Sequence, residues 1–144
     1  NVIREWIKRS RMVSVMMQYS LLDRRPEESC LSLLNENNIG VLARGSVAKG
    51  LLAGKPAASF LNYDSTAVAS AANAIRDCST NRSMAHTAMK FALQHPAITS
   101  AVVGIRNEKQ LEEATAVFES RLLSGSEMEL LRKSVPLNYY DSHR

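Results

Sequence analysis

The sequence is poor in the residues that cross-link a chain, bind metal or anchor a protein in a membrane. Its 144 residues include 2 cysteines and 3 histidines, with no CxxC or histidine-spaced pair that would indicate a disulfide framework or a zinc site. Apolar runs are short, Val15-Met16-Met17 being typical, whereas a membrane span needs roughly 18–20 residues. We therefore expect a cytoplasmic protein with no metal, no membrane contact and no signal peptide, with Cys30 and Cys78 reduced in the core.

The sequence also lacks a large excess of charge of either sign. The chain carries 18 Lys+Arg against 14 Asp+Glu, a formal net charge of +4, without the dense basic stripe of a nucleic-acid-binding protein. A small anionic ligand fits this balance better than a nucleic acid. With 45% hydrophobic and 22% charged residues, the composition is that of one globular domain over residues 1–144, large enough to bury roughly 68–70% of its unfolded surface.

Three apolar segments have the pattern of strands: residues 11–18, 39–43 and 99–103. The second is continuously apolar, as in a parallel sheet buried on both faces. A helix precedes the first strand, and helical spacing follows the strands at Pro26 to about Asn37, Asp64 to Asp77, Ser83 to Gln94, a helix capped by Asn107 with Gln110, and a last helix starting at Ser126 with Glu129 as capping partner. This order predicts an α/β fold whose parallel strands are joined by right-handed crossovers.

Two segments have features of an anion site. Residues 44–55, RGSVAKGLLAGK, combine three glycines with two lysines and an arginine, and glycine lets backbone N–H groups approach phosphate closely. Taken alone, such a loop is also typical of a solvated turn, and it lacks the G-K-[ST] ending of a Walker A motif. Gly104, Ile105 and Arg106 lie between a strand and a helix start, where the positive helix end favours an anion.

Three blocks in order, SVMMQYSLLDRRPE, GVLARGSVAKGLLAGK and AITSAVVGIRNEKQLEEA, resemble the C-terminal part of an aldo-keto reductase. The resemblance covers essentially the whole chain. It implies a (β/α)₈ barrel that reduces aldehydes or ketones by hydride transfer from NADPH. A complete barrel of this kind needs about 250 residues. This chain would therefore be the C-terminal part of that barrel, with its last three parallel strands and their flanking helices.

The resemblance also implies a set of cofactor contacts. Gln18 would bind the nicotinamide carboxamide, and Arg44 stands where many relatives carry an aromatic residue that stacks on the nicotinamide ring. The loop around the pyrophosphate would contain Gly45, Ser46, Val47, Lys49, Gly50, Leu51 and Lys55. Gly104, Ile105 and Arg106 would bind the 2′-phosphate of NADPH, with Gln110 beside it and Glu113 at the adenine amino group. The asparagine that the family has after that glutamate is Ala114 here.

The catalytic tetrad of the family, Asp, Tyr, Lys and His, comes from the N-terminal half of the barrel, and its motifs are not in this chain. We assign no catalytic residue. The histidines have no visible partner, and the tyrosines have no matching lysine; these residues are His86, His95, His143, Tyr19, Tyr63, Tyr139 and Tyr140. We read them as structural or solvated.

A three-strand arc would leave its inner face and both edges open to water. We therefore expect a partner, either the missing N-terminal half or a second copy of the chain, together with a small carbonyl substrate once the barrel is complete. Two other hypotheses stay open. One is a non-catalytic nucleotide-binding or protein-interaction subunit of the same descent, and the other is a small basic scaffold with no cofactor.

Overall fold

Three parallel strands form the centre of the computed structural model, which describes residues 2–142. They are β1 (Ser14–Gln18), β2 (Gly40–Arg44) and β3 (Ile98–Val102), arranged in the order β1-β2-β3. The register pairs Gln18 with Arg44, and Arg44 with Val102. The carboxyl ends of all three strands therefore meet at one edge of the sheet. The predicted α/β order and the parallel pairing are confirmed.

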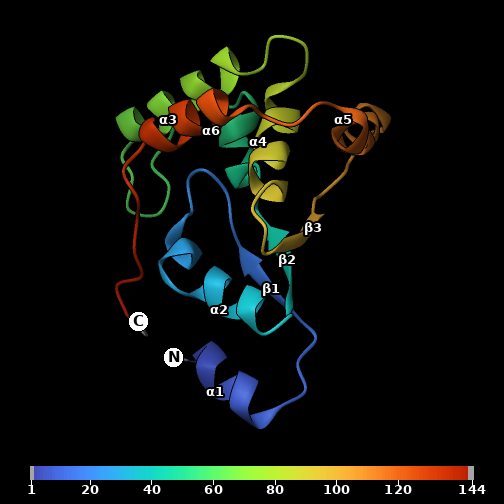
Figure 1. Ribbon diagram of the computed structural model, residues 1–144. Coiled ribbons are helices and arrows are strands. Elements are labelled where there is room, and N and C mark those ends of the chain that lie inside the picture. The colour runs from blue at the N-terminus through green and yellow to red at the C-terminus, as the bar shows by residue number, and fades with distance from the viewer. Residues whose placement is uncertain (1, 143–144) are drawn as a thin grey trace.

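Helices lie before, between and after the strands (Figure 1). They are α1 (Val2–Arg9), α2 (Cys30–Glu36), α3 (Ser65–Asp77), α4 (Met84–Leu93), α5 (Glu108–Glu119) and α6 (Gly125–Lys133), with 3₁₀ turns η1 (Arg25–Glu28) and η2 (Ala48–Ala53). Each β-to-β connection passes through helix, as a parallel pair requires. Within residues 2–142, no helix combines the length and apolarity needed to cross a membrane.

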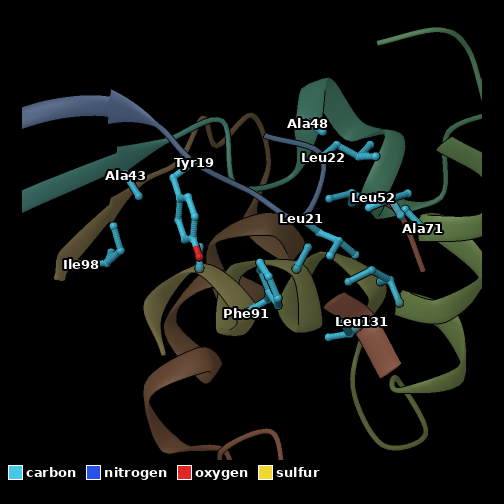
Figure 2. Packing of buried hydrophobic residues seen from close by; sticks show 14 of the residues in the cluster. Tyr19, Leu21, Leu22, Ala43, Ala48, Leu52, Ala71, Phe91, Ile98 and Leu131 are labelled. Carbon is cyan, nitrogen blue, oxygen red and sulfur yellow. The ribbon is translucent and has the colours of Figure 1, made fainter. Parts of the chain in front are cut away.

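The core lies between the sheet and the helices, as Figure 2 shows. Val41 and Ala43 alternate along β2 and are fully buried. Helix α2 packs on β2 and α4 on β3, while α3 extends the same core by packing on η2, α4 and α6. Tyr19 stacks on Phe91 with ring centroids 6.3 Å apart. In contrast, Met16 is 53% exposed and Val102 is 43% exposed. The sheet therefore keeps exposed apolar side chains that the helices do not cover.

Helix starts differ from the sequence predictions in two places. Pro26 opens a 3₁₀ turn, and the α-helix begins only at Cys30. The last helix is capped by Ser124 with Glu127, so the prediction of Ser126 with Glu129 was wrong. The physical reason is tertiary, because Arg121 and Arg82 both bind the Glu127 carboxylate and hold it beside Ser124, while Glu129 pairs with Lys133.

The two cysteines lie at different depths. Cys78 is buried at the end of α3 and Cys30 is half-buried at the start of α2, so the prediction of a core position holds fully for Cys78 only. Both are free thiols. Among the described residues, no group of three or more His, Cys, Asp or Glu side chains is placed to hold a metal ion.

Candidate cofactor site

Gln18 and Arg44 end the neighbouring strands β1 and β2 and contact each other. The Arg44 Nη1 donates to the Gln18 Oε1 at 3.0 Å, and the Tyr19 N–H donates to the Arg44 carbonyl at 3.1 Å. Arg44 is exposed and Gln18 is half-buried. The sheet register thus brings together two of the predicted cofactor residues. Because the guanidinium holds the amide oxygen, the Gln18 amide nitrogen is the atom left to face a ligand.

Gly45 continues from Arg44 in the left-handed region, with φ of 72°. A Cβ there would lie 3.3 Å from the Gln18 Cγ, which is tighter than ordinary van der Waals contact. Glycine avoids both the left-handed strain and this crowding. The chain can therefore turn sharply beside Gln18 and start the loop that the sequence predicts for the pyrophosphate.

Ser46 and Val47 follow in this turn. The Ser46 side chain is 1% exposed, and its Oγ has no hydrogen-bond partner. Among residues 2–142, the backbone N–H groups of Ser46 and Val47 have no protein acceptor, whereas the Ala48 N–H donates to the Gly45 carbonyl at 2.8 Å. Unsatisfied backbone donors next to a left-handed residue form the kind of concavity that binds anions.

Residues 48–53 of the loop form the 3₁₀ segment η2, which a kink at Lys49 and Gly50 interrupts. Ala48, Lys49 and Gly50 all have positive φ, at 47°, 57° and 94°. The Lys55 Nζ donates to the Lys49 carbonyl at 2.9 Å, and its side chain passes directly over Gly50. Leu51 is 8% exposed and belongs to the core, so its side chain is not available to a ligand.

The third block starts where β3 ends. Gly104, Ile105 and Arg106 are exposed, and the Gln110 Oε1 accepts a hydrogen bond of 2.8 Å from the Arg106 N–H. The Asn107 Oδ1 caps α5 by accepting from the Gln110 N–H at 3.0 Å. The predicted cap is confirmed, but the Gln110 side chain binds one residue before the cap. Gln110 therefore fixes the loop that carries Arg106.

Glu113 lies one turn further along α5 and lines a cleft of about 630 Å³ between α5 and the start of α4. Arg82, His86 and Ser120 line the same cleft. Burial, followed by the nearby Arg82 and Lys90 charges, lowers the pKa of His86, whereas Glu113 acts in the opposite direction. The neutral imidazole is thus favoured there, and its Nε2 lies 2.7 Å from the Ser120 Oγ.

The charged residues 23–28 after β1, to which sequence analysis gave no part in the site, form a largely buried structural cluster. Arg24 binds the Glu27 carboxylate at 2.9 Å, and the Tyr19 hydroxyl donates to Glu27 at 2.8 Å. Burial would raise the pKa of Glu27, but the hydrogen bonds from Arg24 and Tyr19 outweigh it and the net shift is downward. Burial and the Glu27 charge raise the pKa of Tyr19. A tyrosine held this way is a poor acid, which agrees with a structural role.

Two of the histidines are also structural. The His95 ring packs edge-on against Tyr19 with centroids 5.6 Å apart, and its Nδ1 accepts from the Ala97 N–H. His86 contacts Ser120 as described. His143 lies outside the described residues. Sequence reasoning missed the partners of His86 and His95 because each comes from a segment distant in the chain or from a turn that only the fold defines.

The model of the aldo/keto reductase family matches residues 3–135, so the chain belongs to that family. It is 37% identical over 153 residues to an uncharacterized oxidoreductase, YqkF, of Bacillus subtilis (strain 168), covering 100% of this chain and 50% of the relative. The aldo-keto reductase AKR11C1 from Bacillus halodurans, solved in holo and apo forms, superposes with a TM-score of 0.85 at 33% identity. That match covers 99% of this chain and 48% of the holo structure.

A more distant solved structure, the glycerol dehydrogenase AKR11B4 from Gluconobacter oxydans, shares the fold with a TM-score of 0.75 at 21% identity, over 99% of this chain and 49% of that protein. The chain therefore spans about half the length of the relatives it matches. Its three parallel strands and flanking helices are part of a (β/α)₈ barrel.

Proposed function

We propose that this chain is the NADPH-binding half of an aldo-keto reductase that reduces an aldehyde or ketone. The observation that carries the proposal is the register at the carboxyl ends of the strands, which pairs Gln18 with Arg44 and Arg44 with Val102. The three sequence blocks thereby share one edge. Ligands of (β/α)₈ barrels bind at this edge.

The residues at this edge fit a dinucleotide phosphate. Ser46 and Val47 offer backbone N–H groups without a protein acceptor within residues 2–142. Ser46 adds a buried hydroxyl without a partner. Arg44 and Arg106 are exposed cations. Donors and positive charge at one edge are the chemistry that a pyrophosphate and a 2′-phosphate require.

Each group has a separate task in this proposal. The Ser46 and Val47 N–H groups bind the pyrophosphate, while the Gln18 amide orients the nicotinamide carboxamide. Arg106, beside the positive end of α5, binds the 2′-phosphate, and Gln110 holds the Arg106 backbone in place. NADPH supplies a hydride when bound.

Reduction of a carbonyl also needs an acid that protonates its oxygen, and Tyr19, buried against Glu27, does not offer one. We propose that the N-terminal half of the barrel supplies it and covers the exposed Met16 and Val102. Burying exposed apolar surface stabilises such an assembly. A second copy of this chain would cover the same surface without adding the tetrad. A cytoplasmic location fits the free Cys30 and Cys78 thiols.

A fluorescence titration tests the proposal. NADPH and NADH are added to the full 144-residue chain, alone and mixed with the first half of the Bacillus subtilis relative supplied as a separate polypeptide. We expect NADPH to bind more tightly than NADH, and the mixture to oxidise NADPH when an aldehyde is added. Absence of NADPH binding in both samples would refute the proposal. Binding in the mixture without aldehyde-dependent oxidation would instead support a non-catalytic nucleotide-binding subunit.

A further inference from the structure

Helix α5 is held to the rest of the protein by little apolar contact. Of its 12 residues, only Val117 is buried. Its other large apolar residues point to solvent, with Leu111 49% exposed and Phe118 77% exposed. Figure 1 shows α5 at the margin of the molecule, and its main packing partner is α4. Apolar burial of this extent leaves the direction of a helix poorly determined.

Polar side chains of α4 supply the missing attachment. His86, Lys90 and Gln94 follow each other at intervals of four residues, which places them on one face at the α4 side of α5. The Lys90 Nζ donates to the Val117 carbonyl at 2.6 Å and to the Ser120 carbonyl at 2.9 Å. We call the side chains of His86, Lys90 and Gln94 the α4 clasp.

The other two members of the α4 clasp bind the end of α5 and the segment after it. The Ser120 Oγ donates to the Val117 carbonyl at 3.1 Å, so the His86 Nε2, 2.7 Å from that oxygen, is the donor of their hydrogen bond. Gln94 binds Leu123 through both backbone groups, accepting from its N–H at 2.6 Å and donating to its carbonyl at 3.1 Å. His86 and Lys90 therefore hold the carboxyl end of α5, and Gln94 holds the segment that follows it.

Lys90 is the central member. Its residue is 5% exposed, and burial followed by the Arg82 charge lowers its pKa. A cation at the last carbonyls of a helix interacts favourably with the helix dipole. Here it also gives the Ser120 carbonyl a donor and adds a second donor to the Val117 carbonyl, which the Ser120 hydroxyl already binds. Removal of the ammonium would leave the Val117 carbonyl with the Ser120 hydroxyl alone and take the Lys90 donor from the part-buried Ser120 carbonyl, so the carboxyl end of α5 would shift.

The amino end of the same helix carries the candidate phosphate contact, because Gln110 binds the Arg106 N–H. Helix α5 rises 1.5 Å per residue and is about 18 Å long, so a tilt of about 10° at its carboxyl end moves its amino end by about 3 Å. Binding groups must be held to about 0.5 Å of the productive geometry. A small change of helix direction after loss of the Lys90 contacts therefore becomes a displacement of several ångströms near Arg106.

We infer that the α4 clasp positions α5, and that Lys90 is thereby a positioning residue for selection of NADPH over NADH. The inference rests on the proposed function, since it assumes that Arg106 binds the 2′-phosphate. Lys90 does not touch the cofactor in this account. It acts through α5 and the Gln110 contact.

The test compares Lys90→Met with Lys133→Met, a control in which an exposed lysine paired with Glu129 on α6 is replaced. Dissociation constants for NADPH and NADH are measured for the full chain mixed with the first half of the Bacillus subtilis relative, at a temperature well below the melting point of every variant. We expect Lys90→Met to weaken NADPH binding by about 3- to 30-fold and NADH binding by less than about twofold. Lys133→Met should leave both unchanged.

Amide hydrogen exchange supplies a second readout that needs no cofactor. Lys90→Met should speed exchange over residues 108–119 and leave α3 as in the parent chain. Equal weakening of NADPH and NADH, or unchanged exchange in α5, would overturn the inference. If Lys90→Met does not fold, Gln94→Leu replaces it, with the same expectations because it removes both Leu123 contacts.

The two proposals fail in different ways. A parent protein that does not distinguish NADPH from NADH refutes the 2′-phosphate role, and the selectivity part of this inference with it, whatever hydrogen exchange shows. A parent protein that selects NADPH, together with a Lys90→Met variant of equal selectivity, refutes the α4 clasp alone.

Discussion

The Arg44 guanidinium donates a 3.0 Å hydrogen bond to the side-chain oxygen of Gln18, across the carboxyl ends of two parallel strands. The contact orients the Gln18 amide, since one of its two ends is already bound. It also places a positive charge beside the left-handed turn at Gly45. The two side chains therefore form the start of the candidate cofactor site before any ligand arrives.

Replacement of Gln18 should affect both nicotinamide cofactors alike. Gln18→Ala removes a neutral hydrogen bond to the carboxamide, which NADPH and NADH share, so we expect each to bind more weakly by about 0.5–1.5 kcal/mol. Fluorescence titration measures the change. Ser14→Ala, at the other end of the same strand, is the control and should bind as the parent does. A Gln18→Ala variant with unchanged affinity would remove Gln18 from the site.

Replacement of Arg106 should separate the cofactors. Arg106→Ala removes a charge-assisted contact to the 2′-phosphate, so NADPH should bind more weakly by about 1–3 kcal/mol while NADH is spared. The same titration measures both affinities. Arg76→Ala, on α3, controls for the loss of one positive charge elsewhere. Equal losses for NADPH and NADH would contradict the assignment.

Two glycines of the loop, compared with Gly104 after β3, test the geometry of the loop without any ligand. Gly50 has φ of 94°, and a Cβ there would lie 2.9 Å from the Lys55 side chain, so Gly50→Ala should lower stability by about 1–3 kcal/mol. Gly54 has φ of 98° in open space, so Gly54→Ala isolates the strain of a left-handed backbone, about 1–2 kcal/mol. Gly104→Ala meets nothing within 4 Å and should be nearly neutral. Denaturant unfolding ranks the three, and any other order is evidence against this loop conformation.

The cap of α6 predicts an acid-sensitive part of the stability. Hydrogen bonds from Arg121 and the Ser124 backbone lower the pKa of Glu127 from 4.5 to about 2. Because the folded pKa is the lower one, this contribution is complete above pH 4.5 and is lost as the pH falls towards 2. Glu127→Gln should lower stability at pH 7 by about 0.5–2 kcal/mol, the range for a helix cap.

Thermal unfolding from pH 7 to pH 2 measures the Glu127 contribution. We expect the difference between the parent and Glu127→Gln to shrink below pH 4.5. Glu129→Gln, which breaks an exposed pair with Lys133, is the control and should show a small difference at every pH. A constant difference for Glu127→Gln across the range would contradict the lowered pKa.

Local sequence patterns determined the elements of this protein. Alternating and continuous apolar runs predicted the three strands, and side-chain caps such as Asn107 predicted helix starts, because both depend on neighbours a few residues away. The glycines of residues 44–55 likewise predicted a loop after β2. The order of the three blocks was enough to indicate the family. These features depend on contacts between residues that are close together in the sequence.

Only the tertiary structure decided which side chains meet. Lys90 binds the carbonyls of Val117 and Ser120. Glu127, and not Glu129, completes the cap of α6. Leu51 is buried in the core. The physical reason is that each outcome depends on a partner or a buried surface brought from a distant part of the chain. A local pattern sets the preference of one segment, whereas desolvation and hydrogen bonding between segments select among the arrangements that the preference allows.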